Sequence, residues 1–324
     1  MGDLYIPNSV ALRSFDSIFK NNDLIFDNKE VAISFHPTYV AMHPIGIAFY
    51  AALGDLWREK GIKTSAAINY EIRSIPYLQR MGLFNALGYV NPIPIIEHEE
   101  TGRFIPLTKI KTGQELESFI KTIDPILHTS RNNSRAIKHV FSELLRNVIE
   151  HSESRFGANV CASYNKKRKK ISIGISDSGQ GLLKSLQKSH FVASDKDALI
   201  KALTPGITGS TSRLGGNEQN AGAGLFFTKC IAQSTKNHFI IYSGSAYYKL
   251  LFTKTKKVIF NPNPQNDNCN IKTGIPFFNG TLVGLDIQIN DDKAFNNLIE
   301  KIGEAYQLGV KKTKKDYYSK IKFV

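Results

Sequence analysis

The stretch FSELLRNVIEH, from Phe141 to His151, places a Glu, an Asn and a His four residues apart within an amphipathic pattern. At 100° per residue, a helix gathers its apolar side chains on one arc, namely Ile137, Val140, Phe141, Leu144, Leu145 and Val148. Glu143, Asn147 and His151 then fall together on the edge of that arc, and Arg146 points away. The sequence therefore predicts polar residues at the border between core and solvent.

Such a border can be either the ordinary solvent-exposed edge of a surface helix or the wall of a pocket. A carboxylate and an amide oxygen one turn apart can hold Mg²⁺, directly or through its waters. A glutamate in that place could also accept a proton from an attacking water. Because polar residues flank most amphipathic helices, the motif taken alone favours the ordinary edge.

A second motif, DSGQG, runs from Asp177 to Gly181 directly after the segment KKISIGIS at 169–176. That segment alternates Ile with Ser or Gly, which is typical of a half-buried strand. Asp177 would lie at the strand end, and Gly179 and Gly181 would let the chain turn sharply beside a flat ligand. Asp-Ser-Gly is also a common turn sequence, so turn and site are equally open here.

A third motif, NAGAGLFFTKCIA at 220–232, places Gly222, Gly224 and Leu225 at the start of a predicted helix. Free backbone N–H groups at a helix start form a cradle for anions. The spacing matches neither the dinucleotide-binding Gly-x-Gly-x-x-Gly nor the P-loop. The preceding stretch from Thr204 is rich in Gly, Ser and Thr, which predicts a lid or a disordered loop. Thr281 follows Gly280 at the start of a late predicted strand.

The order of these four motifs resembles that of the GHKL ATP-binding superfamily, which includes gyrase, heat-shock chaperones, histidine kinases and mismatch-repair ATPases. The resemblance covers roughly residues 115 to 290. It implies an α/β (α+β) fold of the Bergerat type, a sandwich of a mixed sheet with helices on one face. The expected divisions are a first domain at 1–100, a GHKL domain at 101–290, and a C-terminal helix with a basic tail at 291–324.

The resemblance implies ATP and Mg²⁺ as cofactors and gives several residues roles in binding them. Asn147 would bind the Mg²⁺ ion, and Asp177 would accept a hydrogen bond from the adenine amino group. Gly179 and Gly181 would shape the adenine pocket. Thr281 would lie near the adenine.

The same resemblance gives roles at the phosphate end of the nucleotide. Gly222, Gly224 and Leu225 would support the phosphates where the lid ends, and either Arg213 or nearby hydroxyls in the lid would reach the γ-phosphate. Glu143 matches the position of the general base in the branches that hydrolyse ATP. His151 matches the residue that ends the Asn helix in the kinase-like branches.

The first hundred residues resemble a STAS-like domain of the anti-sigma-antagonist type over about residues 29 to 90. Strand VAISF at 31–35, helix 45–61, strand 63–70 and the segment YLQRMGLF carry this resemblance, and a hairpin turn is expected around Gly102. The family presents a phosphorylatable Ser or Thr before the main helix. Here the loop MHPIG at 42–46 has no hydroxyl, so a docking or dimerising role is expected instead. An unrelated small α/β unit remains an alternative.

Composition and charge bound the class of protein. Hydrophobic residues make up 42% of the 324 residues and charged residues 22%, a globular composition. No apolar stretch is long enough for a membrane helix, the start lacks a secretory pattern, and three scattered cysteines form no disulfide framework. We therefore expect a soluble cytoplasmic protein. Part of the net charge of +14 lies in KKRKK at 166–170 and in the C-terminal tail, either as solvated runs or as a nucleic-acid contact.

Three functions fit these observations. The first is an ATP-hydrolysing regulatory switch, whose lid state is read by the STAS-like domain or by a protein partner. The second is an anti-sigma-type Ser/Thr protein kinase acting in partner switching. The third is a nucleotide-sensing adaptor without hydrolysis that contacts nucleic acid through its basic tail. A homodimer is compatible with each of them.

Overall fold

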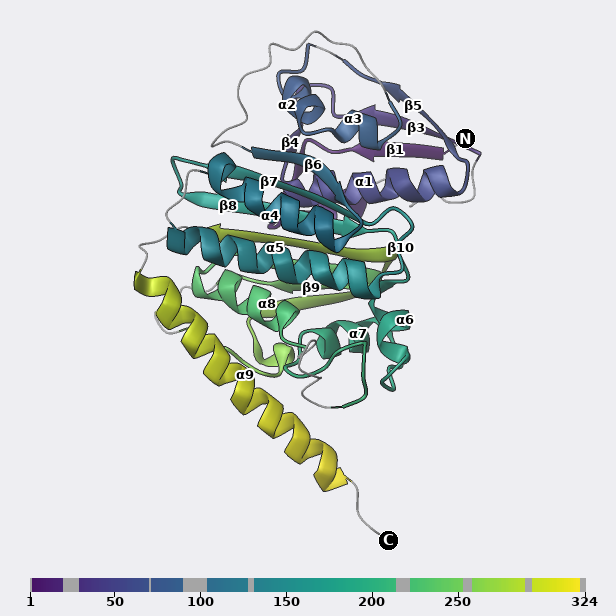
Figure 1. The fold of residues 1–324 in the computed structure, drawn as a ribbon. Coiled ribbons are helices and arrows are strands. Elements are labelled where there is room, and N and C mark those ends of the chain that lie inside the picture. Colours follow the sequence, from purple (N-terminus) through teal and green to yellow (C-terminus); the bar gives the residue numbers. More distant parts are fainter. Residues whose placement is uncertain are drawn as a thin grey trace.

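The computed structural model describes residues 2–19, 29–69, 71–89, 104–127, 131–213, 222–252, 258–288 and 293–320 (Figure 1). The hairpin turn predicted around Gly102 and the part of the predicted lid at 214–221 lie outside these residues. The chain is a mixed α/β protein, with parallel sheets and helices first and a five-stranded antiparallel sheet with helices after them.

The N-terminal unit is built on a three-stranded parallel sheet in the order β1-β3-β5. Its strands are β1 (Gly2–Ile6), β3 (Glu30–Phe35) and β5 (Lys63–Ala67). The main helix α1 (Pro44–Glu59) connects this sheet's second and third strands. Smaller elements complete the unit, namely β2 (Ser9–Val10), η1 (Phe15–Phe19), β4 (Ala41–Met42), α2 (Ile75–Arg80) and α3 (Leu83–Ala86).

The larger sheet has the order β6-β7-β8-β10-β9, and every pairing in it is antiparallel. Its strands are β6 (Phe104–Ile110), β7 (Ala158–Asn165), β8 (Lys170–Asp177), β9 (Phe239–Leu250) and β10 (Cys269–Gln288). The expectation of a mixed sheet was wrong. The short turn between β7 and β8 forces antiparallel pairing, and β10 returns between β8 and β9 in the direction opposite to both.

Helices cover both faces of this sheet, not one face as predicted. The outer face carries α4 (Gly113–Leu127), α5 (Arg131–His151) and α8 (Gly224–Ser234), and α9 (Lys293–Lys320) packs on α5 and α8 before extending beyond the body (Figure 1). Two short helices, α6 (Gly181–Gln187) and α7 (Asp195–Ala202), lie at one end of the sheet. The inner face is covered by α1, which contacts β7, β8 and β10.

The small residues of β8 explain why α1 can lie there. Ser172 and Ser176 are buried, and Gly174 faces the first turn of α1. A Cβ on Gly174 would lie 2.2 Å from the Pro44 carbonyl oxygen, and the Ser176 hydroxyl donates to the Ala48 carbonyl at 2.6 Å. The alternation in this strand was read correctly, but the serine and glycine face is a helix-packing surface and not a solvated one.

Helix α1 is therefore buried on all sides. Every residue from Pro44 to Trp57 is buried, and the helix shares one apolar cluster with β1 and β3 of the N-terminal sheet and with Tyr242 and Phe278 of the large sheet. A helix that is apolar all round belongs in the interior of a larger body. The N-terminal unit is thus a fixed layer of the fold.

Polar ties reinforce this junction at both ends of α1. At its end, the buried Asp55 carboxylate accepts from Arg58, Lys109 and, at 2.8 Å, from the amide nitrogen of Asn159. At its start, the His43 Nδ1 accepts from the Ile45 N–H, so that Nε2 carries the proton and donates to Asp286 at 3.1 Å. Among the helices of the described chain, none has the length and hydropathy to cross a membrane.

Candidate functional site

Helix α5 carries the polar edge predicted from FSELLRNVIEH. The apolar arc is buried as expected, Arg146 is exposed, and Glu143, Asn147 and His151 are partly exposed along one edge. Asn147 and His151 line a cavity between α5, the large sheet and α6, whereas Glu143 lies beside it. The helical prediction for this stretch is confirmed.

Asp177 ends β8 and points into the same cavity. Its side chain is 1% exposed, and its Oδ1 accepts from the Gly179 N–H at 2.8 Å, while the nearby Thr281 N–H also favours the ionised carboxylate. Burial raises the pKa of Asp177 to about 7, against the lowering effect of these two N–H donors. A carboxylate has about four acceptor positions, so acceptor capacity is left for a donor in the cavity.

The DSGQG turn is fastened to the end of α5. The Gln180 N–H donates to the Ser152 carbonyl at 2.7 Å, and the Gln180 side chain donates to the His151 carbonyl at 2.7 Å. A Cβ on Gly179 would lie 2.0 Å from the Ser152 oxygen, so that position excludes any side chain. The turn thereby brings Asp177 and the Asn helix to one site.

The start of α8 closes the opposite wall of the cavity. Gly222, Gly224 and Leu225 line it, and Gly222 has a φ of +66° that favours glycine. A Cβ on Gly224 would lie 2.6 Å from Glu143 Oε2 and 3.5 Å from Asn147 Nδ2. The first turn of α8 therefore lies directly against the two polar residues of α5.

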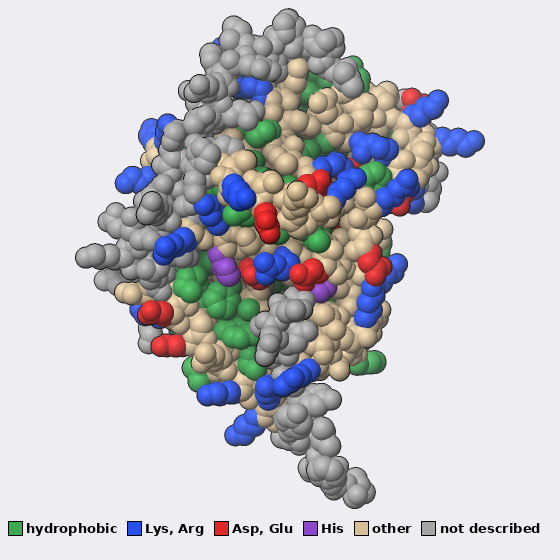
Figure 2. Space-filling model, viewed as in Figure 1, with side chains coloured by type: hydrophobic (Ala, Val, Ile, Leu, Met, Phe, Trp, Pro, Cys, Tyr) green, Lys and Arg blue, Asp and Glu red, His purple; other side chains and the backbone are tan. Residues whose placement is uncertain are grey.

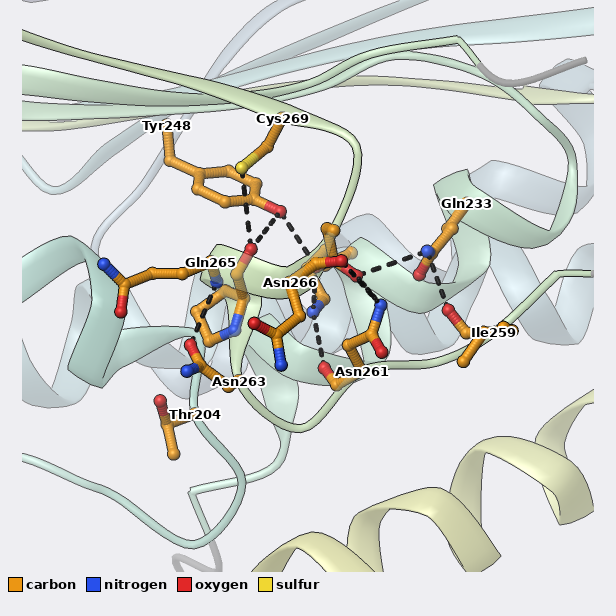
Figure 3. Close-up of polar contacts among 12 residues, drawn as sticks. Thr204, Gln233, Tyr248, Ile259, Asn261, Asn263, Gln265, Asn266 and Cys269 are labelled. Carbon is orange, nitrogen blue, oxygen red and sulfur yellow. Dashed lines mark hydrogen bonds and ion pairs between the residues drawn. The ribbon is translucent and has the colours of Figure 1, made fainter.

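A buried ion pair anchors α8 from behind. Lys229 of α8 contacts Asp267 at 2.6 Å, and both side chains are fully buried. The same carboxylate accepts from the Tyr248 hydroxyl at 2.9 Å and from the Asn261 amide at 3.0 Å (Figure 3). This network fixes α8 to the segment before β10 and so holds the glycines at its start in place.

The structure brings together most of the residues predicted for the site. The cavity is lined by Asn147, His151, Asp177, Gly181, Gly222, Gly224, Leu225 and Thr281. Glu143 and Gly179 lie immediately beside it, against Gly224 and Asp177. Arg213 is exposed and does not line the cavity, and its N–H donates to the Thr211 hydroxyl at 3.1 Å.

Several lining residues escaped the sequence interpretation. Ile175 and Val283 lie two residues from Asp177 and Thr281, so strand periodicity places them on the same face. Val148 and Leu144 adjoin Asn147 on the helix and give the cavity an apolar wall. Thr208 belongs to the stretch that was predicted as a lid with hydroxyls near the γ-phosphate, but this loop is irregular and the sequence carries no periodic signal that singles Thr208 out.

A wider polar opening adjoins this cavity. It is lined in part by Arg146, His151, Lys188 and Ser210. Arg146 approaches the carboxylates of Glu143 and Glu150 no closer than 3.9 Å. Arg146 and Lys188 thus line this opening together with the Glu150 carboxylate, and His151 lines both the opening and the cavity.

The donor set of the site bears on which metal it could hold. Within the described residues no group of three or more His, Cys, Asp or Glu side chains could hold a metal ion. A transition-metal centre therefore has no ligand set there. Mg²⁺ requires fewer protein ligands, because it keeps waters and takes phosphate oxygens, and the Asn147 amide at the cavity wall suits that role.

No protein-family model matches the sequence, and a search among curated proteins finds no match either.

Proposed function

We propose that this chain is a Mg²⁺-dependent ATP-binding regulatory protein of the GHKL type, and that it hydrolyses ATP. One observation carries the proposal: residues from all four sequence motifs line one cavity, although the first motif and the last are more than a hundred positions apart. A chance set of turn and helix-edge residues would be scattered over the surface. The layer formed by α4, α5 and α8 on one face of the sheet is the part of the expected Bergerat-type fold that supports the proposal, although the sheet is wholly antiparallel and α1 covers its other face.

The adenine base belongs at the Asp177 end of the cavity. Asp177 is a buried acceptor with capacity for one more donor, which suits the exocyclic amino group of adenine. Apolar side chains of Val148, Ile175 and Val283 surround it and suit a flat ring. Gly181 also lines the cavity, with a φ of +75° that favours glycine.

The phosphates belong at the Asn147 end. Helix α8 is eleven residues long, and its N-terminus contributes backbone N–H groups at Gly224 and Leu225 that favour anions. Asn147 would hold the Mg²⁺ ion, which supplies charge neutralisation for the phosphates when bound. Glu143 lies against Gly224, so a proton leaving an attacking water could pass to its carboxylate.

The N-terminal unit fits the STAS-like interpretation in its alternation of parallel strands and helices. Its loop before α1 is packed against the large sheet, with His43 bonded to Asp286. We therefore assign this unit a structural role towards the ATP domain, and a protein partner would meet its outer surface.

The kinase alternative is supported by the STAS-like interpretation of the N-terminal unit. Because His43 and Pro44 are packed against the large sheet, the acceptor would have to be a hydroxyl of another protein. The adaptor alternative draws on charge: residues 166–169 are exposed, as are Lys311, Lys312, Lys314 and Lys315 of α9. Figure 2 also shows Lys and Arg side chains gathered over the end of α1, where Arg58, Lys109 and Arg155 surround the ring of Phe156.

One experiment separates these functions. The protein is incubated with γ-labelled ATP and Mg²⁺, alone and with cell extract. Free phosphate that disappears in Glu143→Ala supports the ATPase, and label on another protein supports the kinase. ATP binding without either product supports the adaptor. Wild-type protein that binds neither ATP nor an analogue would refute the proposal as a whole.

A further inference from the structure

Ser243 of β9 connects three elements behind the cavity without lining it. Its side chain is buried, at 2% exposure. The hydroxyl donates to the Gly280 carbonyl of β10 at 2.7 Å and accepts from the Leu182 N–H of α6 at 2.9 Å. Gly280 precedes Thr281, and both Thr281 and Leu182 line the cavity.

The first of these bonds fixes the orientation of one peptide unit. The carbonyl of Gly280 and the N–H of Thr281 belong to the same planar trans peptide, so they point in opposite directions. Ser243 holds the carbonyl, and the N–H at the other end faces Asp177, whose pKa it lowers. Gly280 has a φ of +132°, and a Cβ there would lie 2.1 Å from the Asp177 carbonyl oxygen, so the peptide is pressed against β8.

The second bond fixes the beginning of α6. The first N–H groups of a helix have no partner within the helix, and Ser243 supplies one for Leu182. Gly181 has a φ of +75°, and a Cβ there would lie 2.9 Å from the Ser243 hydroxyl oxygen. The turn that carries two cavity residues is therefore built around this hydroxyl.

We propose that Ser243 is a positioning residue of the nucleotide pocket, which holds the Thr281 N–H on Asp177 and the start of α6 at the cavity wall. The inference rests on the proposed function, since it concerns recognition of the adenine by Asp177. Among the described residues, His151 of α5 is the other ionisable side chain that lines the cavity, whose remaining polar lining is neutral.

The test is Ser243→Ala. This change removes the hydrogen bond from the Ser243 hydroxyl to the Gly280 carbonyl. We expect the ATP affinity at pH 8 to fall about fivefold, the loss typical of a neutral hydrogen bond. The freed peptide should also donate less well to Asp177, so the carboxyl should titrate at higher pH in the ligand-free protein. NMR of ¹³C-labelled aspartate carboxyls measures this, and the affinity loss should be larger at pH 6.5 than at pH 8.5.

Ser176→Ala is the matched control. This serine is also buried and donates to a backbone carbonyl, that of Ala48 at 2.6 Å, but it lies on the opposite face of the sheet. It should lower stability without changing the affinity or the Asp177 titration. Ser243→Cys, which keeps a weak donor of similar volume, should give intermediate values and serves if the alanine variant does not fold.

The outcomes are distinct. Unchanged affinity and an unchanged Asp177 titration in Ser243→Ala would overturn the inference, and so would an equal shift in Ser176→Ala. Failure of the wild-type protein to bind ATP would overturn the proposed function instead. In that case the Asp177 titration of the ligand-free variants would still decide whether Ser243 positions this site.

Discussion

Replacing Asp177 with Asn should raise the stability of the protein at pH 8 and lower its affinity for ATP. Asp177 is 1% exposed, and its pKa rises from an ordinary 3.8 to about 7. The native state therefore holds the proton more tightly than the unfolded chain. The contribution of Asp177 to the free energy of unfolding is fully present below about pH 4. It is lost as the pH rises through about 7 and does not return at higher pH.

The magnitude follows from that rise. About three pH units correspond to about 4 kcal/mol of unfolding free energy lost when the carboxylate is ionised. Asparagine removes this cost but buries an NH₂ group without an acceptor, which costs about 1–3 kcal/mol. At pH 8 we expect Asp177→Asn to be more stable than wild type by about 1–3 kcal/mol. Its oxygen can still accept from the Gly179 N–H.

Nucleotide binding should change in the opposite direction. A hydrogen bond from the adenine amino group to an ionised carboxylate contributes about 1.5–3 kcal/mol. Its loss, with the amide NH₂ group facing another donor, should weaken ATP binding at least about tenfold. Wild-type affinity should rise between pH 6 and 8, because binding requires ionised Asp177, and about half a proton should be released per nucleotide at pH 7.

Isothermal titration in buffers of different ionisation enthalpy measures affinity and proton release, and urea unfolding at pH 8 measures stability. Asp197→Asn is the control, since this carboxylate of α7 is bonded to Ser194 and lies outside the cavity. If Asp177→Asn bound ATP as tightly as wild type, the adenine assignment would be wrong. If it were less stable at pH 8, the account of the buried carboxylate would be wrong.

Three further changes test other parts of the site. Glu143→Gln should keep ATP affinity within about threefold but lower turnover at least about a hundredfold, because the amide cannot accept the proton of water; equal turnover in a phosphate-release assay would remove Glu143 from catalysis. Gly224→Ala should weaken ATP binding about tenfold because its methyl group would meet the Glu143 carboxylate at 2.6 Å. Its control, Gly303→Ala, meets nothing within 4 Å on α9 and should leave the measured Kd unchanged. Lys229→Met should lower the urea-derived unfolding free energy by about 3–5 kcal/mol, since it leaves the buried Asp267 carboxylate without its cation, and a loss below about 1 kcal/mol would contradict a dry ion pair.

The site was more predictable from the sequence than the fold around it. Glu143, Asn147 and His151 follow a helical period, and Asp177 follows a strand with clear alternation, so local rules place them. Their convergence depends on strand order, which no local rule gives. Arg213 is not among the residues that line the cavity, and its role towards the γ-phosphate stays a prediction.

Several features of the two sheets could not be predicted from local sequence patterns. Strands β1 and β6 were not predicted: GDLYI is short and FIPLTKI is interrupted by Pro106. The sequence predicts the late strands in fragments, FIIYS at 239–243, YYKLLF at 247–252 and TLVGLDIQI at 281–289, whereas β9 and β10 run continuously through a bulge near Gly244, which has a φ of +62°. The covered inner face was missed because the partner of Gly174 lies about 130 residues away in the chain.

The position of α1 has a consequence for how the chain is made. Its apolar surface is completed only by β7, β8 and β10, and the ribosome begins to make the first of these strands 99 residues after Glu59. Contacts so distant in sequence form slowly, and exposed apolar segments aggregate meanwhile. During synthesis, Pro44–Glu59 should therefore be the segment that a chaperone shields, and release from that chaperone should await the arrival of β10.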